Sequence, residues 1–351
     1  MMADGMISRL DGPVTFVLPV RALAVLALLC AGIGTLVVAS LMAGSYPLTA
    51  GEVAATVLGR APSDMGETVV WQFRLPRALA ALFAGGLFAT SGAVLQIVTR
   101  NALADPSLIG VSQGAGLAVV TAIVVAPDLP HVLRPALAFA GALAVAALIQ
   151  TLAMRRAEGA TMRFILTGIG VAAFIAAATS ALLTYGQIDQ AMAALGWLAG
   201  SVHAVGWTDV AILGGACALL APALAAAARP LRALRLGPEL AAGLGVRVGP
   251  ARIALITLAV ALAAAAVAIV GPLGFVGLIA PHLAQRLARA DVGLHLSLSA
   301  ATGAALVAAA DLAGRTVADP VQIPAGLVTA VVGIPVFVLL ILRPTPEATR
   351  L

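Results

Sequence analysis

The sequence predicts an all-α membrane protein that crosses the bilayer about ten times, and two observations carry this prediction. Hydrophobic residues make up 62% of the 351 positions, and the mean hydropathy is +1.08. A soluble core does not need so much apolar sequence, so the chain belongs in a bilayer. Only 10% of the residues are charged, and most arginines lie in short segments between apolar runs. This placement indicates membrane orientation rather than nucleic-acid binding, despite a sequence pI near 10.5.

The chemistry available to the chain is limited by its residue types. All 20 basic residues are arginines, so a G-x-x-x-x-G-K-[ST] phosphate loop cannot exist and ATP would have to bind another subunit. Cys30 and Cys217 lie inside apolar runs and predict neither a disulfide nor a metal site. No catalytic constellation is evident and no cofactor is expected, because the histidines lie in separate segments without i,i+4 partners: His131, His203, His282 and His295.

The predicted organisation is one transmembrane domain, 18–343, between a cytoplasmic tail, 1–17, and a C-terminal tail, 344–351. The first apolar run, 18–42, is too long for the core of a signal peptide, so we expect a helix that stays in the membrane. Residues 46–71 contain three acidic residues and are predicted to form an outside loop.

Further spans follow the apolar runs along the chain. They are predicted at 78–99, at a run that ends near 126, and at 135–154, 161–186 and 207–228. Residues 191–202 are too few to cross a bilayer, which needs about 20, and are predicted to form an interfacial helix outside. The span at 78–99 is crowded with small residues that would let another helix approach closely: Gly85, Gly86, Ala89, Ser91 and Gly92.

The run 253–285 has no charged residue over 33 positions. A single helix of that length would measure about 50 Å, against a hydrocarbon core of about 30 Å. Arginines flank both ends, so both ends are predicted to be cytoplasmic and the run crosses twice. The turn is placed at 271–274, where Gly-Pro breaks a helix. Spans at 296–313 and 325–342 complete ten crossings, with both termini cytoplasmic.

Arginine placement supports this topology, because fifteen of the 20 arginines fall in segments predicted to be cytoplasmic. The outside arginines are Arg60, Arg74, Arg77, Arg134 and Arg315. Arg74 and Arg77 share a helix face, and two explanations remain open for them: recognition of carboxylates on a soluble partner, or contact with lipid phosphate or a local salt bridge. Asp311 is the only carboxylate well within a span and is predicted to pair with Arg315 one helical turn later.

The segment 229–252 concentrates five arginines between two apolar runs. It contains a short helical pattern, with Pro238 and Glu239 at its start and glycines at its end. Leucines recur in it every four residues, at Leu236, Leu240 and Leu244. Two interpretations are open: a short helix that touches a soluble partner, or a solvated loop whose arginines only fix the topology.

Several blocks together resemble the FecCD-type permeases of bacterial ABC importers for iron-siderophores, haem and cobalamin. They occur in family order and cover most of the chain from Arg74 to Arg343. The blocks are RLPRALAALFAGGLFATSGAVLQIVTRNALADPSLIGVSQGAG from Arg74, GWLAGS from Gly196, LGPELAAGLGV from Leu236, GPLGFVGLIAPHLAQR from Gly271, and ADLAGRTVADPVQIPAGLVTAVVGIPVF from Ala310. One departure is Ala102, where the family usually has proline, and a local change in that inside loop is expected.

The resemblance implies a type II ABC importer fold of ten helices per subunit and a set of partners. These are a cytoplasmic ABC ATPase dimer, a soluble substrate-binding protein, and a second permease subunit, expected to be a copy of this chain with a sibling permease as the alternative. It implies a pathway at the dimer axis lined by 161–186 and 325–342.

The resemblance also assigns roles to particular residues. The resemblance implies that Arg74, Arg77 and Arg315 contact the binding protein. It also matches a family motif near the cytoplasmic end to Pro281, His282 and Arg286. The residues that the resemblance assigns to coupling with the ATPase are Leu234, Arg235, Leu236, Gly237, Pro238, Glu239, Leu240, Leu244 and Gly245.

The predicted function is that of a non-enzymatic permease in the bacterial cytoplasmic membrane, which passes a ferric siderophore or haem inward. The alternatives are a cobalamin importer and, outside this class, an ion-coupled secondary transporter or a membrane-embedded enzyme. A secondary transporter would need acids nearer mid-membrane than Asp311, and an enzyme would need a polar cluster within the spans.

Overall fold

The computed structural model describes residues 6–7, 17–153, 160–318 and 320–342. Most of the predicted tails, 1–17 and 344–351, and the predicted cytoplasmic arginines Arg155, Arg156 and Arg343 lie outside these residues. A pair of two-residue strands, β1 (Met6–Ile7) and β2 (Val17–Leu18), precedes the first helix. The rest of the described chain consists of helices and loops.

Ten helices in the described part of the chain follow the ten predicted spans. They are α1 (Val20–Met42), α4 (Leu75–Thr99), α5 (Val111–Val125), α6 (Arg134–Ala153), α7 (Ala160–Tyr185), α9 (Trp207–Arg235), α11 (Val248–Val270), α12 (Val276–Leu287), α13 (Val292–Thr316) and α14 (Ala325–Leu342). Seven of them are long and apolar enough to cross a membrane, and α5, α12 and α14 are the shorter ones.

Shorter helical elements connect these spans. They are α2 (Ala50–Val57), α3 (Asp64–Thr68), the π-helical turns η1 (Val69–Arg74), the 3-10 turns η2 (Pro106–Ile109) and η3 (His131–Leu133), α8 (Ile188–Leu198) and α10 (Pro238–Gly243). The helix α8 lies at the position of the predicted interfacial helix.

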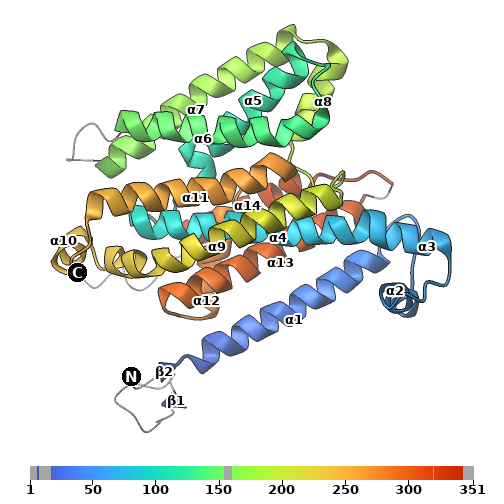
Figure 1. The fold of residues 1–351 in the computed structure, drawn as a ribbon, viewed down its shortest axis with the longest axis horizontal. Coiled ribbons are helices and arrows are strands. Elements are labelled where there is room, and N and C mark those ends of the chain that lie inside the picture. The colour runs from blue at the N-terminus through green and yellow to red at the C-terminus, as the bar shows by residue number, and fades with distance from the viewer. Residues whose placement is uncertain (1–5, 8–16, 154–159, 319, 343–351) are drawn as a thin grey trace.

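The helix α4 is the centre of the bundle. It runs through the middle of the molecule and packs against α13, α11, α12 and α9 (Figure 1). Its small residues make this possible, because a Cβ at Gly85 would overlap the carbonyl oxygen of Gly303 in α13. A Cβ at Gly92 would overlap the carbonyl oxygen of Gly277 in α12 in the same way. The close approach expected from these small residues is therefore present on two sides of α4.

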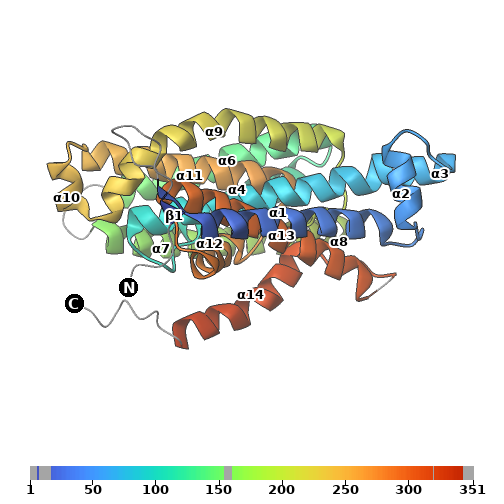
Figure 2. The same ribbon diagram turned by 90° about the horizontal axis from the view of Figure 1, so that it is seen from below.

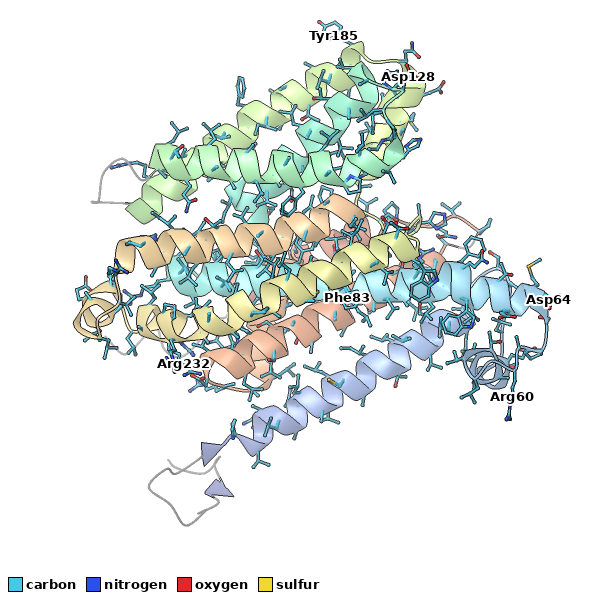
Figure 3. All side chains as sticks on the ribbon, in the orientation of Figure 1. Arg60, Asp64, Phe83, Asp128, Tyr185 and Arg232 are labelled. Carbon is cyan, nitrogen blue, oxygen red and sulfur yellow. The ribbon has the colours of Figure 1, made fainter. Side chains whose placement is uncertain are left out.

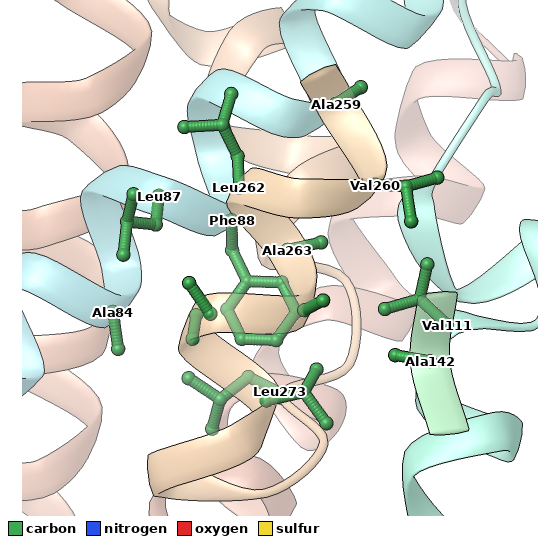
Figure 4. Packing of buried hydrophobic residues seen from close by; sticks show 14 of the residues in the cluster. Ala84, Leu87, Phe88, Val111, Ala142, Ala259, Val260, Leu262, Ala263 and Leu273 are labelled. Carbon is green, nitrogen blue, oxygen red and sulfur yellow. The ribbon is translucent and has the colours of Figure 1, made fainter. Parts of the chain in front are cut away.

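The helices α5, α6 and α7 form a separate layer on the other side of α11 (Figure 1). Alanines at 138, 142 and 146 recur every four residues along α6 and are buried. This period places them on one face of the helix, where their small side chains allow α6 to lie close to α5 and α11. Within the main bundle, Phe88 from α4 packs beside Ala263 of α11 and Leu273 (Figure 4).

The predicted break in the uncharged run is confirmed. The helix α11 ends at Val270 and α12 starts at Val276, with Gly271 at φ +70° and Phe275 at φ +65°. A left-handed conformation is unusual for a residue with a Cβ, so the surrounding structure must hold Phe275 in place. The loop is anchored by the Ser201 N–H, which donates to the Val270 carbonyl at 2.8 Å.

The helix α9 is longer than predicted, because it continues beyond residue 228 to Arg235. Pro222 and Pro230 lie inside it, although each removes a backbone hydrogen bond. Leu231 and Leu234 are buried in the main core, and this packing holds the last turns helical. The first part of the segment 229–252 is therefore the end of a long helix and not a loop.

The bundle has two distinct ends. One carries α10 and, near it, Arg232, and is called the α10 end; the other carries α2 and α3 with Arg60 and Asp64, and is called the α2 end (Figures 1 and 3). The helix α14 stands away from the other helices on one side of the bundle (Figure 2).

Candidate functional site

At the α10 end, a single short helix joins the two long helices α9 and α11. Gly237 at φ +114° and Gly245 at φ +83° bracket α10, and residues with a Cβ rarely adopt these conformations. Pro238 takes the first helical position, as predicted. All the residues assigned to coupling lie between the last turn of α9 and the start of α11: Leu234, Arg235, Leu236, Gly237, Pro238, Glu239, Leu240, Leu244 and Gly245.

The leucines of this segment divide into anchors and an exposed set. Leu234 is buried, and so is Ala241 of α10. Leu236, Leu240 and Leu244 are instead between 58% and 65% exposed. A hollow of about 350 Å³ beside them is lined by Arg229, Pro230, Arg232, Ala233, Leu236, Leu244 and Val246. Exposed leucines beside arginines, in a link between two spans, form a surface suited to contact with another protein.

A second hollow at this end, called the α10-end cavity, brings the predicted family motif next to the coupling segment. Its volume is about 250 Å³, and its lining is Gln96, Ile97, Arg100, Ala102, Arg235, His282, Gln285 and His295. Of the motif residues, Pro281 is buried within α12, His282 is half-buried and Arg286 is exposed. Ala102, where the sequence departs from the family pattern, lies in the wall of this cavity.

At the α2 end, Arg77 and Asp311 form a buried ion pair. Arg77 Nε donates to Asp311 Oδ1 at 2.9 Å, and Arg77 Nη2 lies 2.8 Å from the same oxygen. Arg77 Nη1 donates to Gln322 at 2.8 Å and lies 2.9 Å from Nδ1 of His203. Because a guanidinium has no acceptor, His203 Nδ1 is the acceptor in this contact. Arg77 thus joins α4 to α13 and to two loops.

The predicted pair between Asp311 and Arg315 is also present, but it is the weaker contact. Arg315 Nε lies 3.8 Å from Asp311 Oδ2. The principal partner, Arg77, is 234 positions away in the sequence, and local spacing gave no indication of it. The signal that sequence reasoning missed is general: a lone acid within a span requires a cationic partner, and Arg77 stands at the same end of the bundle.

Arg74 and Arg315 close the C-terminal end of α1. Arg74 donates to the carbonyls of Leu41 at 2.6 Å and Met42 at 3.1 Å, and also to that of Tyr46. Arg315 donates to the Ser40 carbonyl at 2.7 Å and to the Ser40 hydroxyl. The last carbonyls of a helix have no partner within the helix, and they carry partial negative charge. The two arginines satisfy them and so fix α1 to the bundle.

The three arginines assigned to docking therefore lie together, in and around one pocket. Their exposed fractions are only 6% to 8%, but each lines a hollow of about 270 Å³. The rest of its lining is Gly44, Ser45, Tyr46, Val69, Phe73, His203 and Gln322. Phe73 is 63% exposed. With Asp311 as the paired acid, three guanidinium groups leave this pocket strongly positive. Recognition of a soluble partner there stays a prediction.

A buried carboxylate that sequence reasoning missed is Asp105. It caps η2 by accepting from the Ser107 N–H at 2.8 Å. Burial raises the pKa of Asp105, and hydrogen bonds from Ser107 and the Leu278 backbone partly oppose that effect. Gln96 donates to the Leu278 carbonyl at 3.2 Å from the same region. The loop after α4 is therefore held against α12; the Asp-Pro sequence, typical of a helix start, was the available signal.

The described residues bring together no group of three or more His, Cys, Asp or Glu side chains that could hold a metal ion. Each end instead combines arginines with exposed apolar side chains around a hollow.

Comparison with known proteins places these features in a family. The model of the FecCD transport family matches residues 28–343. The chain belongs to the FecCD transport family. This match includes both the α10 segment and the three arginines of the α2 end.

Two named transport proteins are similar to this chain over most of their length. The achromobactin transport system permease protein of Dickeya dadantii is 39% identical over 307 residues, which cover 87% of each chain. The cobalamin import system permease protein of Halobacterium salinarum is 34% identical and covers 97% of this chain and 93% of its own.

A solved structure supports the fold assignment. It is described as a metal-chelate type ABC transporter in an inward-facing conformation, and it superposes with a TM-score of 0.81 at 28% identity. The match covers 91% of this chain and 99% of the other. The chain therefore has the fold of a FecCD permease, and it is a multi-pass membrane protein.

Proposed function

We propose that this chain is the permease subunit of an ATP-driven importer that passes an iron chelate, a ferric siderophore or haem, from a soluble binding protein to the cytoplasm. The observation that carries the proposal is the α10 segment, which exposes three leucines between two spanning helices in a member of the FecCD family. The chain has no lysine and hence no phosphate loop, so ATP hydrolysis belongs to a separate ATPase subunit.

In this proposal the α10 end faces the cytoplasm and Leu236, Leu240 and Leu244 enter a groove of the ATPase. The buried anchors, Leu234 and Ala241, tie α10 to its flanking helices. Because α9 and α11 continue directly from this segment, a displacement of α10 moves two spans together. ATP binding would draw two such segments toward each other and switch the dimer between outward-open and inward-open states.

Replacing the exposed leucines with serine (L236S/L240S/L244S) should abolish copurification of the ATPase with the permease. Loss of three buried apolar contacts removes the centre of such an interface. The matched control is V57S/L58S/M65S, which changes three exposed apolar residues at the α2 end and should leave the complex intact. A complex that survives the first variant, or that both variants lose equally, contradicts the coupling role.

At the α2 end we propose that an acidic side chain of the binding protein enters the arginine pocket. Support comes from the positive charge of three guanidinium groups against one carboxylate, and from the fork geometry with which arginine binds carboxylates. Arg74, Arg77 and Arg315 also hold the fold together. Replacing them would change both the affinity for the binding protein and the stability of the permease, so the two effects could not be separated.

Phe73, on the exposed wall of the arginine pocket, permits a cleaner test. F73S should weaken binding of the cognate binding protein to the permease in nanodiscs about fivefold or more, the usual effect of losing an aromatic contact. The control is M65S, which alters a similarly exposed side chain outside the pocket, at 60% against 63%. Equal affinities for F73S and M65S would exclude this pocket as the docking site.

The second permease subunit is proposed to be another copy of this chain, with the pathway between α7 and α14. Support comes from their apolar side chains left exposed in a single subunit, including Leu166, Phe174, Val331 and Ile334. A wall of this kind would bind substrate weakly, which suits a pathway that must release its cargo while the binding protein supplies affinity.

Uptake by iron-starved cells tests the whole proposal. Labelled iron supplied with a panel of siderophores, or as haem, should enter cells that have the chain and not cells that lack it. Uptake must also stop when the partner ATPase is inactivated, because an ion-coupled secondary transporter would continue to work. Unchanged iron uptake across the panel would exclude the iron-chelate proposal, and labelled cobalamin would then test the alternative cargo.

A further inference from the structure

Six of the eight residues that line the α10-end cavity carry hydrogen-bond donors. The cavity brings Arg100 from the end of α4 together with Arg235 from the end of α9. His282 and Gln285 come from α12, His295 from α13 and Gln96 from α4. No carboxylate is among the lining residues. Arg286 follows His282 by one helical turn and adds a further positive charge nearby.

Neither Arg100 nor Arg235 forms a hydrogen bond or an ion pair with another residue that the structure describes. This differs from the arginines of the α2 end, which bond to internal carbonyls and to Asp311. The Arg100 guanidinium lies beside Gly237, since a Cβ on that glycine would be 3.7 Å from Nη1. The Glu239 carboxylate borders the same glycine, with Oε2 at 3.6 Å from that Cβ, but it does not line the cavity. The cavity therefore borders the coupling segment directly.

We propose that the α10-end cavity binds a phosphate group. Guanidinium and imidazole groups are the side chains that recognise phosphate oxygens best, and carboxamides can donate further hydrogen bonds. The volume of about 250 Å³ accommodates a phosphate with part of the group that carries it. The cavity lies at the α10 end of the bundle, where α4 and α9 end and α13 begins.

Phosphate at the α10 end has two sources, which are the headgroup of an anionic phospholipid and phosphate from the aqueous phase. Basic pockets between spanning helices at a membrane surface are suited to lipid headgroups. Ile97 and Ala102 give the cavity an apolar wall against which glycerol or an acyl chain can lie. Either source would bridge Arg235 to α4, α12 and α13 and so fix the start of the coupling segment to the bundle.

The test uses the full chain with two probes. In detergent, native mass spectrometry counts bound phosphatidylglycerol as that lipid is titrated, and equilibrium dialysis measures binding of radiolabelled inorganic phosphate. The variant R100Q/R235Q should lower the affinity for one or both probes at least about tenfold, because two charge-assisted contacts are lost. R100K/R235K keeps the charge and should recover part of the affinity. The control R60Q/R247Q removes two exposed arginines from outside the cavity and should bind as the unaltered chain does.

The two probes separate the sources. Selective loss of phosphatidylglycerol in R100Q/R235Q assigns the site to a lipid headgroup, and selective loss of inorganic phosphate assigns it to a soluble phosphate. If neither probe distinguishes R100Q/R235Q from R60Q/R247Q, the proposal is overturned, including the case in which an acidic side chain of the ATPase occupies the cavity. The proposed importer function does not depend on this result, since ATPase association and uptake are measured separately.

Discussion

Two ion pairs on α13 show how the surroundings of a residue decide what its charge contributes. Near one end of the helix, Asp311 is buried with Arg77; at the other, Asp291 meets Arg232 at 2.9 Å with both side chains more than half exposed. Removing one partner of a buried pair leaves an uncompensated charge in a poorly solvated site. An exposed pair is well solvated in either state and adds little.

The substitution D311N should therefore lower the free energy of unfolding by about 3 kcal/mol. Arg77 would keep its contacts with Gln322 and His203 but lose its counter-charge. D291N, at the residue that precedes α13, should cost less than about 1 kcal/mol. Thermal unfolding of the purified protein in detergent, followed by circular dichroism, measures both. Equal destabilisation by D311N and D291N would show that burial does not set the strength of the Arg77–Asp311 pair.

At the scale of an element, α4 is held at the centre of the bundle by backbone-to-backbone approach. Glycine matters only on the faces where another helix comes closest. Gly92 lies against the backbone of Gly277, whereas Gly86 lies beside a hollow and a Cβ there would meet nothing nearer than Ala300 O at 3.6 Å. Two glycines on one helix therefore have different roles.

The substitution G92A should destabilise the protein by about 1–3 kcal/mol, the usual cost of overpacking, because the Gly277 backbone cannot move aside as a flexible side chain would. G86A should cause no loss and could add some stability, since alanine favours helix over glycine. The same thermal unfolding measurement compares them. A neutral G92A would mean that α4 and α12 can separate without cost.

At the scale of the whole molecule, function requires that the two ends lie on opposite sides of the membrane. Arg60 near α2 and Arg247 near α10 are exposed and stand at opposite ends of the bundle, so they report the orientation. Of the two native cysteines, Cys30 lies in α1 and Cys217 in α9, both within candidate spans.

Single cysteines introduced at these positions, in a chain that carries C30A and C217A, should differ in access to a charged maleimide. R60C should react in intact spheroplasts, and R247C only after permeabilisation, because a charged reagent does not cross the bilayer. Labelling is read as a mass shift on a gel, with the cysteine-free chain as the blank. The reverse pattern would invert the proposed orientation and place the leucines of α10 outside.

The sequence by itself determined the fold class and the order of the spans. The length of each hydrophobic run and the placement of arginines are local properties, and they set which segments cross the bilayer and in which direction. It also located α10, through Pro238, the glycines that follow and the leucine period. It placed the end of α9 too early, because the burial of Leu231 and Leu234 that keeps Pro230 within the helix depends on distant residues.

Only the tertiary structure decided what the arginines do. Arg74 and Arg77 are one helical turn apart, yet one caps α1 and the other binds Asp311. Arg100 and Arg235 are far apart in the sequence, yet they line one cavity and remain unpaired among the described residues. The physical reason is that a membrane span requires only local hydrophobicity. The partner of a guanidinium group depends instead on which helix end lies within hydrogen-bonding distance, and the packing of small residues between helices determines that.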